Sequence, residues 1–257
     1  MRDNMRALSL HPRQTPRDGT PQMDAFQLYL RKIVLLLALA ALGGCATTSP
    51  EDPLEGYNRA MFEFNDSVDR AILKPVAKGY QNVVPAAVDR SITNFFSNLN
   101  DIVVVINDLL QLKLSQAGSD AARLAINSTL GLLGLFDVAT DMGFEKHDED
   151  FGQTLGAWGM GEGAYVVLPL LGPSTVRDTA GLVVDTVTNP VYYIEGPEWK
   201  YGLVALRSVD QRADALRLSR VLEEAALDRY QFVRDAYLQR RDFLIYDGRP
   251  PLEDPAP

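Results

Sequence analysis

The sequence contains a single cysteine and only two histidines among its 257 residues. One cysteine excludes an intramolecular disulfide framework and an all-thiolate zinc site, because both need several thiols. Two histidines leave little material for a histidine-rich metal centre. Basic residues are also in deficit, with 25 Lys and Arg against 34 Asp and Glu. Since nucleic-acid binding depends on clustered Lys and Arg, no nucleic-acid partner is expected.

Long apolar segments are missing as well. After residue 44, no uninterrupted apolar segment approaches the ~20 residues that a membrane-spanning helix needs. A shorter apolar run at 33–42 follows two basic residues and ends at Gly43-Gly44. A basic region, a short apolar region and a small-residue cleavage site are typical of a signal peptide. We predict that 1–44 is this leader and that Met23 is its true start, since Met23 gives a leader of conventional length.

The single cysteine directly follows this leader. Leu42-Gly43-Gly44-Cys45 resembles the bacterial lipobox, which predicts that Cys45 is lipidated, although an ordinary buried thiol is the alternative. By resemblance to sorting in Gram-negative bacteria, Ala46 after the cysteine predicts the outer membrane, with a covalent lipid anchor on the periplasmic side. The leader holds six basic and three acidic residues, so the net charge of −9 becomes −12 after cleavage. Acyl chains, rather than a basic patch, would then attach the protein to the membrane.

The remaining chain has the pattern of a single helical domain. We expect a lipidated tether at 45–52, the domain at 53–247 and a disordered tail at 248–257. Apolar residues recur every three or four positions after Pro53, which predicts an amphipathic helix of about five turns that ends before Pro75.

Two further stretches also favour helix. Residues 102–114 are ambiguous between a strand and a buried helix, and the polar residues Asn107, Asp108 and Gln111, without turn residues, favour a helix. The stretch 199–246 is the clearest helical region.

An apolar stretch without alternation occupies 165–171. Pro169 excludes a regular central strand there, because proline cannot donate a ladder hydrogen bond. The stretch is therefore either buried core or an apolar loop that dips into lipid. Ser174 is expected to cap a following helix that runs to about Thr188.

Catalytic signals are weak. The glycines at 159–163 lack dinucleotide-binding spacing, and Gly172-Pro173-Ser174-Thr175-Val176 lacks the final glycine of a nucleophile elbow. His147 lies in an acidic run at 145–150 that we interpret as a solvated loop rather than a metal site. We therefore predict no catalytic residue, no metal and no enzymatic activity.

Four stretches resemble the VacJ/MlaA lipoproteins and together span nearly all of the chain after the leader. They are DPLEGYNRAMFEFN at 52–65, NSTLGLLGLFDVA at 127–139, DFGQTLG at 150–156 and LPLLGPSTVRD at 168–178. The resemblance implies an all-α, single-domain ring of amphipathic helices, lying in one membrane leaflet around a central amphipathic channel. It also implies removal of mislocalised phospholipids from the outer leaflet of the outer membrane. A trimeric porin and a soluble periplasmic lipid carrier are the implied partners, and phospholipid is the transported ligand, with no cofactor.

Two groups of residues are candidates for this activity. Met61 and Phe64 are expected to hold the ring at its depth and Asn65 to face the lumen, although the apolar residues are equally compatible with plain core. Leu168, Pro169, Leu170, Leu171 and Gly172 are expected to form a mobile apolar hairpin that gates the channel. The alternatives are a non-catalytic envelope scaffold and, less favoured, a lipid hydrolase that uses Ser174 or His147.

Overall fold

The computed structural model describes residues 52–225 and 227–251, leaving aside the side chains of 217–225. The predicted signal peptide, Cys45, the tether before Asp52 and the tail after residue 251 lie outside these ranges. The described helices are α2 (Glu55–Val68), the π-helix η1 (Asp69–Leu73), α3 (Lys74–Val83), α4 (Ala86–Leu110), α5 (Leu114–Thr129), α6 (Val138–Asp141), α7 (Phe151–Ala157), α8 (Val176–Thr188), the 3₁₀-helix η2 (Pro190–Tyr193), α9 (Pro197–Ala225) and α10 (Arg229–Ile245). Two strands, β1 (Tyr165–Leu168) and β2 (Gly172–Thr175), complete the described elements.

The first helix does not end before Pro75, so that prediction is wrong. The helix passes from α2 through η1 into α3 and ends only at Val83. A proline inside a helix removes one hydrogen bond and its ring clashes with the carbonyl four residues earlier, which here belongs to Ala71. The five π-helical residues Asp69–Leu73 surround that position. A wider π turn accommodates the proline while the chain continues in the same direction.

The choice of helix for residues 102–114 is confirmed for most of the stretch. They lie in α4 up to Leu110, and α5 begins at Leu114 after a tight turn. Leu112 in this turn has a φ of 60°, an uncommon conformation for a leucine. The two helices pack against each other as a pair.

The C-terminal helical region is divided into α9 and α10. Asp228 caps α10 by accepting a hydrogen bond from the Gln231 backbone amide at 3.1 Å. Arg59 of α2 binds the same carboxylate through two hydrogen bonds, at 2.8 and 3.3 Å. This capping residue therefore starts a new helix and also ties it to the first one.

The apolar segment forms an antiparallel β-hairpin, which the sequence did not predict as strand. Tyr165 pairs with Thr175 and Leu168 with Gly172. Pro169 is no obstacle because it follows β1 and lies in the turn, where it would donate no ladder hydrogen bond. The next helix also differs in detail: Thr175, rather than Ser174, caps α8 by accepting a hydrogen bond from the Asp178 amide at 3.1 Å.

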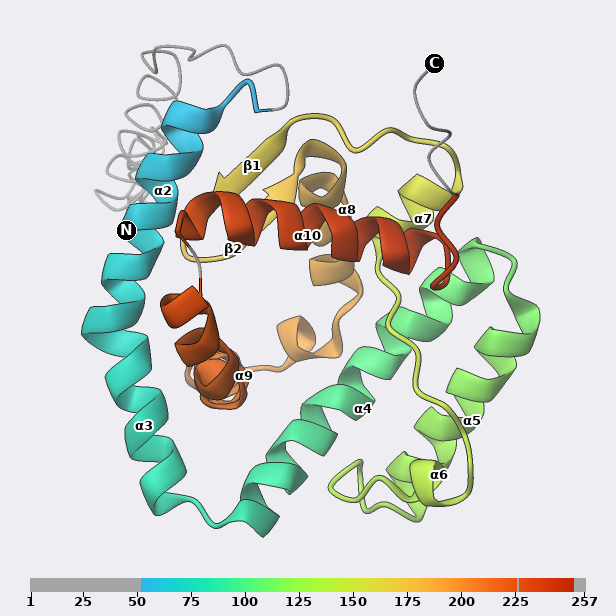
Figure 1. Cartoon of the computed structure of the whole chain (residues 1–257). Helices are drawn as coiled ribbons and strands as arrows, with labels where there is room; N and C mark the ends of the chain where they lie inside the picture. Colours follow the sequence, from blue (N-terminus) through green and yellow to red (C-terminus); the bar gives the residue numbers. More distant parts are fainter. Residues whose placement is uncertain (1–51, 226, 252–257) are drawn as a thin grey trace, which may run out of the picture. The chain divides into compact units, whose positions relative to one another are not determined.

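The elements contact one another in a closed circuit (Figure 1). From α2 the contacts pass to β1 and β2, then to α8, α7, α4, α9 and α3, which continues back into α2. Helix α10 crosses the hairpin and α7. The order of contacts agrees with the predicted helical architecture, whereas the placement in one membrane leaflet stays a prediction. In the described ranges no helix is both long and apolar enough to cross a membrane.

The interior of the described fold is mainly polar. Nineteen polar or charged side chains are buried there, against twelve apolar ones. Soluble proteins show the reverse preference, with charged residues almost never buried unless they are paired. Many large apolar side chains are instead exposed, including Leu130, Leu132, Leu133 and Phe136 in one loop. Contiguous exposed apolar surface of this kind marks a site for membrane or protein contact.

Candidate functional site: a cavity beside the hairpin

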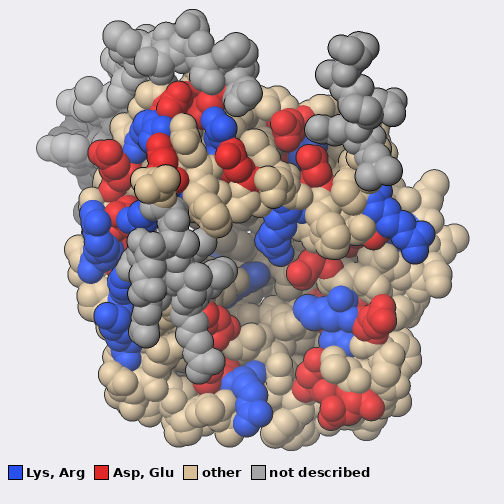
Figure 2. All heavy atoms as spheres, viewed as in Figure 1, with Lys and Arg blue, Asp and Glu red and all other residues tan. Residues whose placement is uncertain are grey.

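A cavity lies among α4, α8, α10 and the β-hairpin. Its volume is about 480 Å³, within the ~300–1,000 Å³ range of small-molecule sites. Figure 2 shows a hollow near the middle of the face in view, with basic and acidic side chains around it. The lining combines aliphatic side chains such as Leu168, Leu171 and Leu182 with charged ones such as Arg207 and Arg240. The cavity is therefore amphipathic.

Two predicted features, Asn65 and the hairpin, meet at the edge of this cavity. The Asn65 amide donates to the Leu168 carbonyl at 2.9 Å, and its oxygen accepts from the Leu170 backbone amide at 2.7 Å. One side chain thus satisfies both a donor and an acceptor of the turn. Leu170 adopts a φ of 64° and is 66% exposed, while Leu171 is 69% exposed. The turn is therefore an apolar tip held to α2 by a single asparagine.

Asn58 repeats this arrangement two helical turns earlier. Its amide donates to the Tyr165 carbonyl at 3.0 Å, and its oxygen accepts from the Val167 amide at 2.8 Å. It also donates to Asp52 at 3.0 Å, and the Asp52 carboxylate accepts from the Tyr230 hydroxyl. Asn58 and Asp52 are fully buried, so Asp52 belongs to the fold and not to the predicted tether.

Sequence reasoning missed the role of Asn58. The available signal was the seven-residue spacing between two asparagines, which places them on one face of a helix. With both in place, α2 acts as a polar partner along the length of β1.

Met61 and Phe64 lie in different environments. Met61 is half-buried and packs on the apolar cluster of Tyr165, Val167 and Tyr230. Met61 thus follows the alternative interpretation, in which the apolar residues of the first helix are part of the core, and it packs against β1 of the hairpin. Phe64 is exposed and remains available for the predicted anchoring role.

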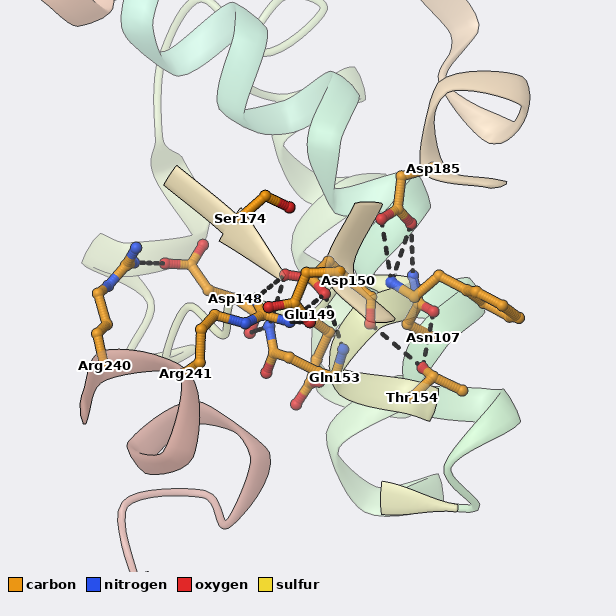
Figure 3. A network of polar contacts seen from close by, with 12 residues as sticks. Asn107, Asp148, Glu149, Asp150, Gln153, Thr154, Ser174, Asp185, Arg240 and Arg241 are labelled. Atoms are coloured by element: carbon orange, nitrogen blue, oxygen red, sulfur yellow. Dashed lines mark hydrogen bonds and ion pairs between the residues drawn. The ribbon is translucent and has the colours of Figure 1, made fainter. Parts of the chain in front are cut away.

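A charge cluster around Arg241 forms the polar wall of the cavity (Figure 3). Its guanidinium binds Asp150 through two hydrogen bonds, at 2.5 and 2.9 Å, and Asp178 through one at 3.0 Å. Arg177 and the Tyr237 hydroxyl also donate to Asp178, at 2.9 and 2.8 Å. Burial raises the pKa of Asp150, but the hydrogen bonds and the charge of Arg241, together with the hydrogen bonds from Gln153, outweigh this effect and hold the pKa below its ordinary value. The cluster contains two carboxylates and two guanidiniums, so its charge is balanced.

The Arg241 cluster depends on close contact between α7 and α8. A Cβ atom added to Gly181 would lie 2.3 Å from the Gly152 backbone nitrogen, too close for any side chain. A Cβ added to Gly152 would lie 2.7 Å from the Asp178 carboxylate and 2.8 Å from Arg241. Glycine at both positions lets the two backbones approach and leaves room for the charged groups.

Asp185 of α8 holds the start of α7 from the other side. Its two carboxylate oxygens accept from the Phe151 backbone amide, each at 3.1 Å. Asn107 donates to the same carboxylate at 3.3 Å and accepts from Thr154 at 2.8 Å. Burial raises the pKa of Asp185 to about 6.

A second cluster, of Asp108, Asp120 and Glu149, is rich in negative charge. All three carboxylates are buried. Lys113 donates to Glu149 at 2.8 Å, and His147 lies 2.8 Å from Asp120. Both carboxylate oxygens of Asp108 lack a hydrogen-bond partner in the described structure. Burial, together with Asp120 and Glu149, raises the pKa of Asp108 to about 7.

The acidic run at 145–150 is only in part the solvated loop that we predicted, since Glu145, Lys146 and Asp148 are exposed but the other residues are not. Glu149 is buried, Asp150 is paired with Arg241, and Lys146 donates to buried Asp101. The run contributes to packing because each of these side chains meets a partner from another helix. A charge run indicates solvent exposure only when no opposite or polar partner is contributed by distant sequence.

The two residues considered for hydrolysis have separate partners. Ser174 exchanges a hydrogen bond with the Thr179 hydroxyl at 2.9 Å, and His147 contacts Asp120. Ser174 lines the cavity and His147 does not. Nucleophilic catalysis requires the base within hydrogen-bond reach of the hydroxyl.

Comparison with known proteins identifies the family. The model of the MlaA lipoproteins matches residues 50–244. This chain belongs to the MlaA lipoprotein family. Among its relatives are the intermembrane phospholipid transport system lipoproteins MlaA of Shigella flexneri and Haemophilus influenzae. The Shigella protein is 35% identical over 88% of this chain and 93% of its own length. The Haemophilus protein is 34% identical over 84% and 91%.

A solved structure supports the same assignment. It comes from work on the structural basis for maintenance of bacterial outer membrane lipid asymmetry. It is 36% identical in sequence, covers 76% of this chain and 98% of its own chain, and superposes with a TM-score of 0.68. The predicted membership in the MlaA family and the predicted helical fold are thus confirmed.

Proposed function

We propose that this MlaA-family protein removes mislocalised phospholipids from the outer leaflet of the outer membrane and delivers them to a soluble periplasmic carrier, which maintains lipid asymmetry. The observation that carries the proposal is the amphipathic cavity beside an exposed apolar hairpin. A phospholipid has a charged head and apolar tails, so its path must offer a polar wall and an apolar one. The Arg241 cluster supplies the first and the hairpin leucines supply the second.

The exposed apolar loops would seat the protein in the membrane. The loop at 130–136 presents five large apolar side chains, and its Leu132 and Leu133 have φ values of 52° and 61°. A positive φ is unfavourable for leucine, and such strained residues persist mainly in functional segments. Leu112 and Leu114 in the α4–α5 turn are also exposed. With each buried CH₂ contributing about 0.8 kcal/mol, these loops add to the affinity of the lipid on Cys45.

The hairpin tip would act as the gate of the cavity. Asn65 fixes the turn by two hydrogen bonds, whereas the leucines at the tip, Leu170 and Leu171, are mostly exposed. Breaking two hydrogen bonds costs about 1–3 kcal/mol, a difference that lipid contact with the tip can offset. The hairpin then moves and opens the cavity to lipid, while Asn58 keeps β1 attached to α2.

Transport of this kind needs no bond cleavage, so the protein acts without catalysis. We assign the trimeric porin and the periplasmic carrier as its partners in the envelope, with the lipid on Cys45 holding the protein to the outer membrane.

The proposal is tested by complementation in a Gram-negative host that lacks its own MlaA gene. Expression of the chain should lower the amount of phospholipid on the cell surface, measured by its accessibility to an added phospholipase. Cys45→Ala, which loses the anchor, should fail to do so at equal expression. Unchanged surface phospholipid with the wild-type chain favours a scaffold, and release of lysophospholipid or fatty acid by the purified protein favours a hydrolase.

A further inference from the structure

Arg207 differs from the other arginines of the cavity in its lack of an ion pair with a described residue. It extends from α9 and lines the cavity together with Arg240 and Arg241 of α10. Arg241 is bound to Asp150 and Asp178, and Arg240 lies 3.9 Å from Asp148. Arg207, by contrast, has no carboxylate within ion-pair distance among the described residues. Its guanidinium donates a long hydrogen bond, of 3.5 Å, to the Asn100 side-chain oxygen.

The position of Arg207 makes this isolation costly. The side chain is partly buried, and burial lowers the pKa of its guanidinium. A buried cation without a counter-ion is unfavourable, because desolvation is not offset by an opposite charge. An anionic ligand in the cavity would supply the missing partner.

The groups next to Arg207 suit a phosphate. Asn100 of α4 contributes a side-chain amide and Tyr192 of η2 a hydroxyl, and both line the same cavity. A guanidinium binds phosphate with two parallel hydrogen bonds, and neutral donors complete the shell of phosphate oxygens.

The carboxylates of the cavity do not oppose such a ligand. Each of the five carboxylates that line the cavity has a partner. Asp150 and Asp178 are neutralised by Arg241 and Arg177, Glu149 is paired with Lys113, and Asp148 lies 3.9 Å from Arg240. Asp185 is bound by the Phe151 amide and Asn107. Among the three arginines that line the cavity, Arg207 is therefore the one that no described carboxylate pairs with.

We infer that Arg207, Asn100 and Tyr192 form a site for the phosphodiester of a phospholipid headgroup. This site deepens the proposed transport function and rests on it. The aliphatic side chains Leu168 and Leu171 line the same cavity, so the glycerol and the first acyl carbons lie toward the hairpin.

The inference is tested by binding of a water-soluble short-chain phospholipid, dihexanoyl phosphatidylethanolamine, to the full lipidated protein in detergent. Dihexanoylglycerol, which lacks the phosphate, is the comparison ligand. Arg207→Gln should weaken binding of the phospholipid about ten-fold or more, the effect of one charge-assisted hydrogen-bonded contact. The same variant should leave binding of dihexanoylglycerol unchanged. Arg207→Lys should restore part of the loss.

Arg240→Gln is the matched control, because Arg240 lines the same cavity but already faces Asp148. It should change binding less than two-fold, and thermal unfolding should show that both variants fold. Equal loss for the two ligands, or no loss in Arg207→Gln, overturns the site. Inorganic phosphate that competes as well as the phospholipid shows a general anion site and also overturns it. If the wild-type chain binds neither lipid, the transport proposal itself fails, which is a separate result.

Discussion

Glu149 and Asp150 are neighbours in the sequence, yet they belong to two buried charge clusters of opposite character. Asp150 joins Arg241, Asp178 and Arg177, where every charge has a partner. Glu149 lies with Asp108 and Asp120, where Lys113 is the main compensating cation and Asp108 has no hydrogen-bond partner in the described structure. The comparison shows how one loop serves two purposes. The balanced cluster forms part of the cavity wall, and the unbalanced one raises the pKa of Asp108 to about 7.

The balanced cluster should be the more sensitive to loss of one member. Arg241→Met leaves buried Asp178 and half-buried Asp150 without their main partner, so we expect a loss of about 3–5 kcal/mol in the free energy of unfolding. Chemical denaturation in detergent measures this loss. Arg240→Ala is the control. The Arg240 guanidinium is exposed and makes a long contact of 3.9 Å with Asp148, so this substitution should lower the free energy of unfolding by less than about 0.5 kcal/mol. Similar values for the two variants would show that the Arg241 cluster contributes little.

The same cluster should also depend on the contact between α7 and α8. Gly181→Ala places a Cβ atom 2.3 Å from the Gly152 nitrogen, and the helices must separate. Overpacking of this kind should cost about 2–3 kcal/mol and weaken the link between Asp150 and Asp178. Gly118→Ala in α5 meets no atom within 4 Å and should stabilise the protein by about 0.5–1 kcal/mol. Thermal unfolding of both variants checks the pair, and an undisturbed Gly181→Ala would contradict the packing described.

The unbalanced cluster should make the free energy of unfolding depend on pH. The folded state raises the pKa of Asp108 from 3.8 to about 7, so it binds more protons than the unfolded state between these values. The free energy of unfolding therefore falls as pH rises through this window. Asp108→Asn removes the titration and should be more stable than wild type by about 1–2 kcal/mol above pH 7, with no advantage below pH 4.

Asp228→Asn is the control with the opposite sign. The Arg59 hydrogen bonds lower the pKa of Asp228, so its contribution is present above pH 4 and is lost as pH falls. Asp228→Asn should thus be less stable than wild type at neutral pH, with the difference shrinking in acid. Unfolding measured from pH 2 to 8 separates the two variants, and parallel curves for them would refute the distinction between paired and unpaired carboxylates.

The helical fold was largely predictable from the sequence. Periodicity indicated the first helix and the C-terminal helical region, and the helical character of 102–114 followed from polar residues without turn signals. A helix up to about Thr188 was also expected, although Thr175 rather than Ser174 caps it. The continuation through Pro75 was not predictable, since it depends on a π-helical segment at Asp69–Leu73 that no periodic pattern encodes. The division between α9 and α10 was missed because the apolar spacing continues across the capping residue Asp228.

The site was only partly predictable, for a different physical reason. Asn65 and the hairpin were both selected, but the hydrogen bonds that join them link residues more than 100 positions apart. The acidic run at 145–150 was assigned to solvent because its partners, such as Arg241 and Lys113, lie far away in sequence. Long-range polar pairing is invisible to local pattern analysis, and this fold relies on it for most of its interior.

The most direct test of the account concerns movement of the hairpin. Asn65→Cys and Leu170→Cys, joined by a short reducible cross-linker, would fix the tip at the position held by the asparagine. The single variant Asn65→Cys, treated with the same cross-linker, is the control. We predict that the cross-linked protein fails to lower surface phospholipid in the host lacking MlaA, and that reduction restores the activity. Transport at the wild-type rate with the tip locked would contradict gating by the hairpin.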